Sequence, residues 1–77
     1  MTVLELASTL REMYGSAPDG DHVVMIHLFA IKYAHFIEAT GATSKEIAVA
    51  AGLNESYGTE IRKGVRLAEY VQVKSSA

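Results

Sequence analysis

Residues 43–64 read TSKEIAVAAGLNESYGTEIRKG, and this stretch decides how the chain is expected to fold. Thr43 is followed three residues later by Glu46, which is the pattern of a capping box. In such a box the two side chains bond reciprocally to backbone amides at the start of a helix. The first half of the stretch therefore predicts a short helix over about 44–51, after which Gly52 turns the chain.

The second half of the stretch predicts another helix, over about 55–63. The Asn54 side chain can accept a hydrogen bond from a free amide of that helix, and Glu55 is favourable near its positive end. Gly64 is expected to act as the C-terminal cap, because glycine readily adopts the left-handed conformation that ends many helices. Two short helices joined by a tight turn follow from these signals.

Residues 1–40 predict two further helices. Over 2–15, apolar residues recur at spacings of three and four, which indicates an amphipathic helix with Thr2 as N-cap and Gly15 as its end. The sequence SAPDGD then predicts a turn. From about 22 to 39 the chain has neither proline nor glycine and keeps a helical periodicity, so we expect one long helix there.

This long helix is apolar around more than half of its circumference. Such a helix is either the central helix of a domain or one half of a dimer seam. We expect it to supply a homodimer interface. The residues expected there form one strip, Val24, Leu28, Ile31 and His35.

The C-terminal part of the chain has a mixed period. Weak alternation over 70–73 predicts either a strand or a docked extended tail, and the final Ser-Ser-Ala is expected to fray. The chain as a whole is expected to be all-α, a compact single domain over 1–77 with four or five helices and an optional short extended segment at the C-terminus.

Composition limits the class of protein further. Of the 77 residues, 49% are hydrophobic, so we expect apolar side chains to fill both a core and a partner interface. The absence of cysteine excludes disulfides and thiolate metal sites. No basic segment followed by an apolar run opens the chain, and the longest apolar stretch, 23–37, is interrupted by charged and polar residues. We therefore expect a cytoplasmic protein with no membrane span.

The charge is acidic overall but uneven. The formal net charge is −2, which counts against a dedicated nucleic-acid binder. Residues 1–40 contain two basic and five acidic side chains, a net of −3, and residues 41–77 contain five basic and four acidic ones, a net of +1. Positive charge is densest between Arg62 and Arg66.

The segment EIAVAAGLNESYGTEIRKG resembles the helix-turn-helix of bacterial and phage repressors. In that family an aliphatic residue and an alanine lie in the first helix, a small residue and a glycine form the turn, and aliphatic residues follow after the turn and late in the second helix. The matching positions here are Ile47, Ala48, Ala51, Gly52, Leu53 and Ile61. The resemblance implies a small helix-turn-helix protein, with scaffold and dimerisation helices in 1–40 and the motif in 43–64.

Gly58 departs from the family pattern, which usually has a buried valine or isoleucine at this position. Glycine inside a helix costs about 1 kcal/mol relative to alanine. Either close contact with the long second helix requires glycine here, or the helix is bent and the match of register is approximate.

The resemblance also implies which side chains face DNA. Asn54 would read adenine, Lys63 would reach guanine or phosphate, and the two arginines would hold phosphates. The implied DNA-binding residues are Ser44, Lys45, Asn54, Ser56, Thr59, Arg62, Lys63 and Arg66.

Two acids fall on the same side of the motif. Glu55 and Glu60 would approach a phosphate-rich surface, where a carboxylate is unfavourable. The alternative is that Glu60 pairs with Lys63, or Glu55 with Thr59, on a solvated face.

Other kinds of site are not expected. His27 and His35 are eight residues apart on the predicted helix, roughly 12 Å by helical rise, which is too far to share a metal within one chain. No nucleophile elbow and no phosphate-binding glycine loop occurs. We therefore expect no catalytic residues, no metal and no cofactor.

The four tyrosines raise the question of stacking on single-stranded nucleic acid. Tyr14 and Tyr33 lie on apolar faces, which favours a place in the core. Tyr57 and Tyr70 flank the basic cluster, and core packing is favoured for them too.

These observations predict a small DNA-binding transcriptional regulator that reads a palindromic double-stranded site as a homodimer. The alternative is a protein-interaction or adaptor module that uses the same fold without binding DNA. Surface charge distinguishes the two hypotheses. Convergence of Lys45, Arg62, Lys63, Arg66 and Lys74 on one face favours DNA, and neutralisation of that face by Glu55, Glu60 and Glu69 favours the adaptor.

Overall fold

The computed structural model describes residues 1–74, and five α-helices make up most of them. The elements are α1 (Val3–Gly15), α2 (His22–Lys32), α3 (Ala34–Thr40), α4 (Ser44–Ala50), a 3-10 turn η1 (Glu55–Tyr57) and α5 (Gly58–Leu67). No strand occurs among the described residues, so the all-α class is confirmed and the strand considered for 70–73 is wrong. The final three residues, for which fraying is expected, lie outside the described part of the chain.

α1 begins where the sequence predicts. The Thr2 hydroxyl accepts a hydrogen bond from the Glu5 amide at 3.1 Å, and the Glu5 carboxylate accepts one from the Thr2 amide at 2.8 Å. This capping box satisfies two backbone donors that the helix itself leaves free. The buried side of α1 consists of Leu6, Ala7 and Leu10.

The prediction of one long helix over 22–39 is wrong, because the structure has two helices there. The axes of α2 and α3 differ by 73°, and the bend lies at Tyr33. A straight helix of this length would extend about 27 Å and would run past the core, whereas the bend brings Ile37 into it. Within residues 1–74 no single helix is long and apolar enough to cross a membrane, and α2 and α3 reach that length and composition only when taken together.

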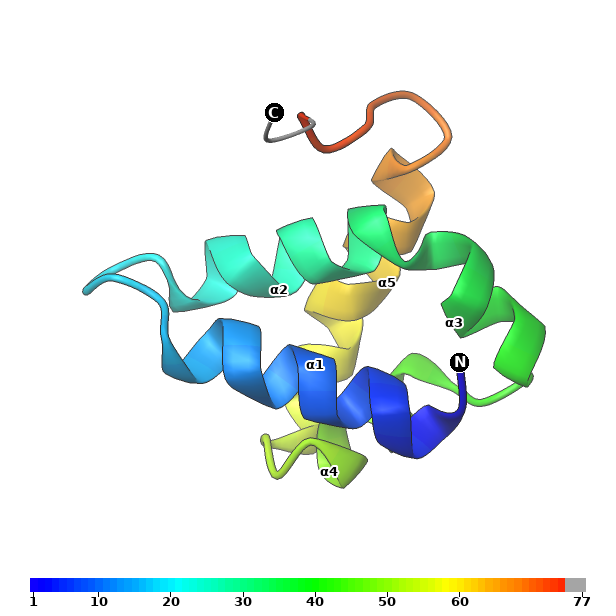
Figure 1. The fold of residues 1–77 in the computed structure, drawn as a ribbon, viewed down its shortest axis with the longest axis horizontal. Coiled ribbons are helices and arrows are strands. Elements are labelled where there is room, and N and C mark those ends of the chain that lie inside the picture. The colour runs from blue at the N-terminus through cyan, green and yellow to red at the C-terminus, as the bar shows by residue number, and fades with distance from the viewer. Residues whose placement is uncertain (75–77) are drawn as a thin grey trace.

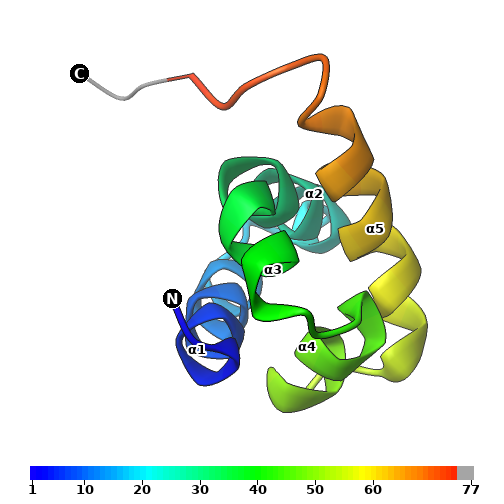
Figure 2. The ribbon, with the colours of Figure 1, turned by 90° about the vertical axis from the view of Figure 1, so that its right-hand side faces the viewer.

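The helices surround one core. α1 and α2 lie side by side and antiparallel, and α5 crosses α2 (Figure 1). Figure 2 shows α1, α2, α5 and α4 around the core, with α3 across one end. The largest fully buried side chains are Phe29, Leu6, Leu10, Ile26, Ile47 and Ile61.

α5 approaches α2 closely because Gly64 has no side chain. A Cβ atom at this position would lie 2.4 Å from the Cβ of Ala30 and 2.9 Å from the carbonyl oxygen of His27. The helix continues through Gly64 to Leu67, so the expectation that Gly64 caps it is wrong. The glycine is required for close packing of two helices rather than for chain reversal.

Candidate nucleic-acid interface

α4, the following turn and α5 form a helix-turn-helix unit that local signals build. Thr43 caps α4 through the predicted capping box with Glu46. Gly52 has a φ of 80°, the left-handed conformation expected of a glycine in this turn. Asn54 accepts a hydrogen bond from the Ser56 amide at 2.9 Å. It therefore caps η1, and α5 starts after this 3-10 turn rather than at residue 55 as predicted.

A contact from α1 that is not among the predictions from the sequence holds the end of α4. Arg11 donates from Nε to the carbonyl oxygen of Ala51 at 3.0 Å and from Nη2 to that of Ala50 at 3.3 Å. The last carbonyls of a helix have no partner within it and carry partial negative charge, so a guanidinium group stabilises them. Local sequence patterns do not reveal this contact, because Arg11 and Ala51 are 40 residues apart.

Gly58 lies where α5 crosses the start of α4. A Cβ atom at Gly58 would lie 2.9 Å from the backbone nitrogen and Cα of Lys45, and 3.2 Å from the carbonyl carbon of Ser44. Close contact therefore explains this glycine, but its partner is α4 and not the predicted long second helix. Ala48, which the motif requires to be small, is fully buried.

The residues implied for DNA contact gather along η1, α5 and the start of α4. Thr59, Lys63 and Arg66 are spaced by four and three residues, so they share one side of α5, and Arg62 flanks them. The exposed members of the predicted set are Lys45, Asn54, Ser56, Thr59, Arg62, Lys63 and Arg66. Ser44 is half-buried beside Gly58. The buried side of α5 consists of Gly58, Ile61 and Gly64.

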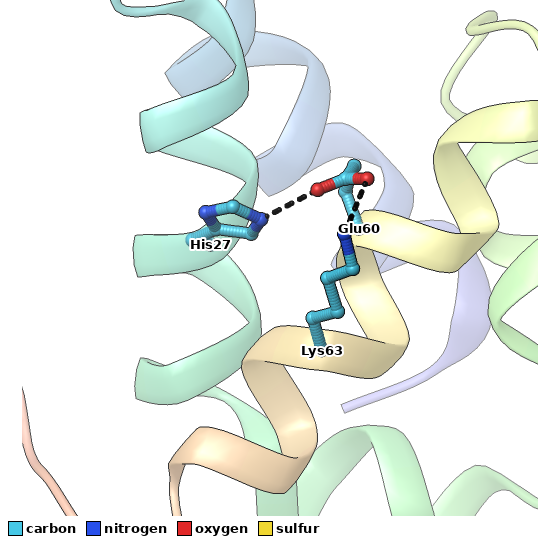
Figure 3. A network of polar contacts seen from close by, with 3 residues as sticks. All are labelled: His27, Glu60 and Lys63. Carbon is cyan, nitrogen blue, oxygen red and sulfur yellow. Dashed lines mark hydrogen bonds and ion pairs between the residues drawn. The ribbon is translucent and has the colours of Figure 1, made fainter.

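Glu60 is turned from this surface toward α2. Its carboxylate lies 2.8 Å from Nε2 of His27 and 3.4 Å from the ammonium nitrogen of Lys63 (Figure 3). The hydrogen bond with His27, assisted by the charge of Lys63, holds the pKa of Glu60 below its ordinary value. The pairing expected between Glu60 and Lys63 is confirmed. His27 is an additional partner, and its separation of 33 residues left no local signal.

The surface charge supports neither the DNA-binding hypothesis nor the adaptor hypothesis alone. Glu55 pairs with Lys45 at 3.3 Å rather than with Thr59. Lys45 and Lys63 therefore each face a carboxylate, whereas no ion pair among residues 1–74 involves Arg62 or Arg66. Arg62, Lys63 and Arg66 gather on the exposed side of α5, but Lys63 there and Lys45 on α4 are each partly neutralised by a carboxylate.

A groove of about 550 Å³ is lined by residues of α3, α5 and the start of α4. Its apolar floor includes Ile37, Ala42 and Val65, and its rim includes Glu38, Lys45, Glu55 and Arg62. Cations and carboxylates share this rim, so the groove does not select a ligand of one charge. Within the described residues, no three His, Cys, Asp or Glu side chains lie close enough together to hold a metal ion.

The residues predicted for a dimer interface do not form one straight seam. Val24, which is 47% exposed, and the half-buried Leu28 and Ile31 are spaced by four and three residues on α2. His35 is exposed on α3, beyond the 73° bend. An association of two chains through the α2 strip stays a prediction.

Comparisons with known proteins place this geometry in context. The sequence profile of a protein family described as an HTH-like domain matches residues 2–74, which is nearly the whole chain. Neither the curated proteins nor the solved structures give a match.

Proposed function

The chain belongs to the HTH-like domain family, and from that premise we propose that it binds double-stranded DNA with α5 in the major groove. The observation that carries this proposal is the exposed side of α5. Thr59, Lys63 and Arg66 share that side with Arg62 next to them, and Glu60, which pairs with Lys63, is also held by His27 of α2. An exposed helix with cations along its outer side suits the width and charge of the major groove.

The side chains divide into two groups by their reach. Ser56 in η1 and Thr59 at the start of α5 lie in the part of a recognition helix that meets base edges. Arg62, Lys63 and Arg66 follow on the next turns and are suited to phosphates, as is Lys45 at the start of α4. Reading of adenine by Asn54 competes with its cap, because the side-chain oxygen needed for that contact already accepts a hydrogen bond from the Ser56 amide.

Homodimerisation is part of the proposal. One short recognition helix on a chain of net charge −2 gives weak binding. Two copies joined through Val24, Leu28 and Ile31 of α2 would present two recognition helices to a palindrome, with half-sites about 34–36 Å apart. The role is that of a small transcriptional regulator of bacterial or phage type in the cytoplasm, with no catalytic step.

A second candidate function is an adaptor that binds protein rather than DNA. The ion pairs of Lys45 with Glu55 and of Lys63 with Glu60 favour it, because each places a carboxylate beside a lysine proposed to contact DNA. DNA binding would require each lysine to exchange its carboxylate for a phosphate. An acidic surface elsewhere, with a net of −3 over residues 1–40, would then meet the protein partner.

The experiment is a DNA-binding titration across a salt series, with a random duplex pool and light scattering on the same sample. We expect binding that weakens steeply with salt and enriches a palindrome. Arg62→Ala and Arg66→Ala should each lower the salt slope by about one contact. Lys32→Ala on α2 is the charge-matched control and should leave the slope unchanged. A folded dimer that does not bind duplex DNA even at low salt would refute the proposal and favour the adaptor.

A further inference from the structure

Core packing is expected for all four tyrosines, but Tyr70 does not pack in the core. Its side chain is 82% exposed. The other three tyrosines are half-buried and pack against rings: Tyr14 with His22 and Tyr57, and Tyr33 with Phe29. A large aromatic side chain left in water raises the question of what covers it.

Tyr70 forms one wall of a shallow groove at the end of α5. The groove has a volume of about 300 Å³ and is lined by Lys63, Arg66, Leu67 and Tyr70. Leu67 is also exposed, so an aromatic and an aliphatic side chain lie beside two cations. We call this surface the Tyr70 groove.

The charge of the Tyr70 groove calls for an anionic occupant. Arg66 is in no ion pair within the described residues, and Lys63 shares the Glu60 carboxylate with His27. His27 holds Glu60 from the α2 side at 2.8 Å, so Lys63 can turn to another anion without leaving Glu60 unpaired. An anion with a flat apolar part would satisfy both the cations and the exposed ring.

We propose that the Tyr70 groove binds one unpaired nucleotide, with its base stacked on Tyr70 and its phosphate between Lys63 and Arg66. This inference rests on the proposed DNA-binding function. Tyr70 follows the C-terminal end of α5, and the bases of a duplex are met by the N-terminal part of a recognition helix, so Tyr70 lies away from the base-reading end. Paired bases offer no free face to a side chain, whereas an unpaired base stacks on an exposed aromatic ring. The preferred nucleic acid is therefore a duplex next to a single-stranded segment.

An acidic peptide with an apolar residue is the competing occupant. It offers the same negative charge and an apolar side chain. Nucleic acid is favoured because Lys63 and Arg66 belong both to the groove and to the side of α5 proposed to face DNA.

The test measures binding of the full chain to three labelled probes: a blunt duplex, the same duplex with a three-thymine overhang, and the single strand alone. The variants are Tyr70→Ala and Tyr70→Phe, with Val71→Ala as the control for loss of a neighbouring exposed apolar side chain. We expect the wild type to prefer the overhang probe to the blunt duplex. Tyr70→Ala should weaken overhang binding by about 5- to 100-fold and leave blunt-duplex binding unchanged. Tyr70→Phe and Val71→Ala should match the wild type.

The outcomes separate this inference from the proposed function. Equal binding of blunt and overhang probes, or no loss in Tyr70→Ala, overturns the nucleotide site alone. Equal losses in Tyr70→Phe and Tyr70→Ala overturn stacking, because the ring is then not the contact. Single-strand binding that depends on Tyr70, without duplex binding, overturns the proposed function and keeps the groove. Failure to bind any probe overturns both. Displacement of the overhang probe by a Glu/Leu decapeptide, with blunt-duplex binding unchanged, overturns the nucleotide site alone and makes the peptide the occupant of the groove.

Discussion

Replacing Gly64 by alanine tests whether close approach of α5 to α2 holds the fold together. The new methyl group would lie 2.4 Å from the Cβ of Ala30, and it would lie 2.9 Å from a backbone carbonyl oxygen, that of His27. Carbon atoms meet at about 3.5 Å or more, so the overlap is about 1 Å and α5 must move. The carbonyl cannot rotate away as a flexible side chain could.

The magnitude follows from two opposing effects. Overfilling a packed interface costs about 1–3 kcal/mol, and contact with backbone places Gly64→Ala near the upper end. Alanine favours a helix over glycine by about 1 kcal/mol. The net expectation is a loss of about 2 kcal/mol in the free energy of unfolding, or roughly 8–16 °C in Tm for a domain of this size.

The assay is urea and thermal unfolding followed by helical circular dichroism. Gly15→Ala is the matched control, because a Cβ there meets nothing within 4 Å and its φ is not positive. It should be neutral or stabilising by up to about 1 kcal/mol. Adding Ala30→Gly to Gly64→Ala should recover part of the loss, since it removes the nearest atom but not the carbonyl. A Gly64→Ala variant as stable as Gly15→Ala would refute the packing argument.

Three further predictions concern contacts that position the helix-turn-helix. Arg11→Ala should lower the free energy of unfolding by about 1 kcal/mol. Arg11→Lys should not restore that stability, because the guanidinium group reaches two carbonyl oxygens with two separate donors. Equal stability of the wild type and both variants in urea would contradict this. Thr43→Ala should lower the free energy of unfolding by about 1 kcal/mol through loss of the α4 cap. Thr43→Ser keeps the capping hydroxyl and should retain most of the wild-type stability in the same assay. The pKa of Glu60 is lowered by its hydrogen bond to His27, so the carboxylate adds stability above about pH 4.5 that is lost as the pH falls through the folded-state pKa. The stability difference between wild type and Glu60→Gln should therefore shrink between pH 7 and about pH 3, and an unchanged difference would show that the pairing does not stabilise the fold.

The sequence alone determined the features that depend on residues a few positions apart. The N-cap at Thr2 and the capping box at Thr43 were predictable because each joins a side chain to a backbone amide three residues away. The left-handed turn at Gly52 and the cap by Asn54 have the same local character. These signals, with helical periodicity, were sufficient for the all-α class, and the resemblance to helix-turn-helix proteins is confirmed by the family match over residues 2–74.

The tertiary structure decided what depends on partners far along the chain. No proline or glycine lies near the bend at Tyr33. The bend instead allows α3 to pack over the core. The sequence predicts that Gly64 ends a helix. The structure shows instead that glycine is required there for packing, because Ala30 of α2 leaves no room for a side chain. His27 of α2 binds the Glu60 carboxylate, and Tyr70 is exposed to solvent. The helical periodicity of the sequence predicted neither outcome. Short-range signals set where helices start and turn, whereas the way the helices pack against one another decides which of their side chains are buried, paired or free to bind.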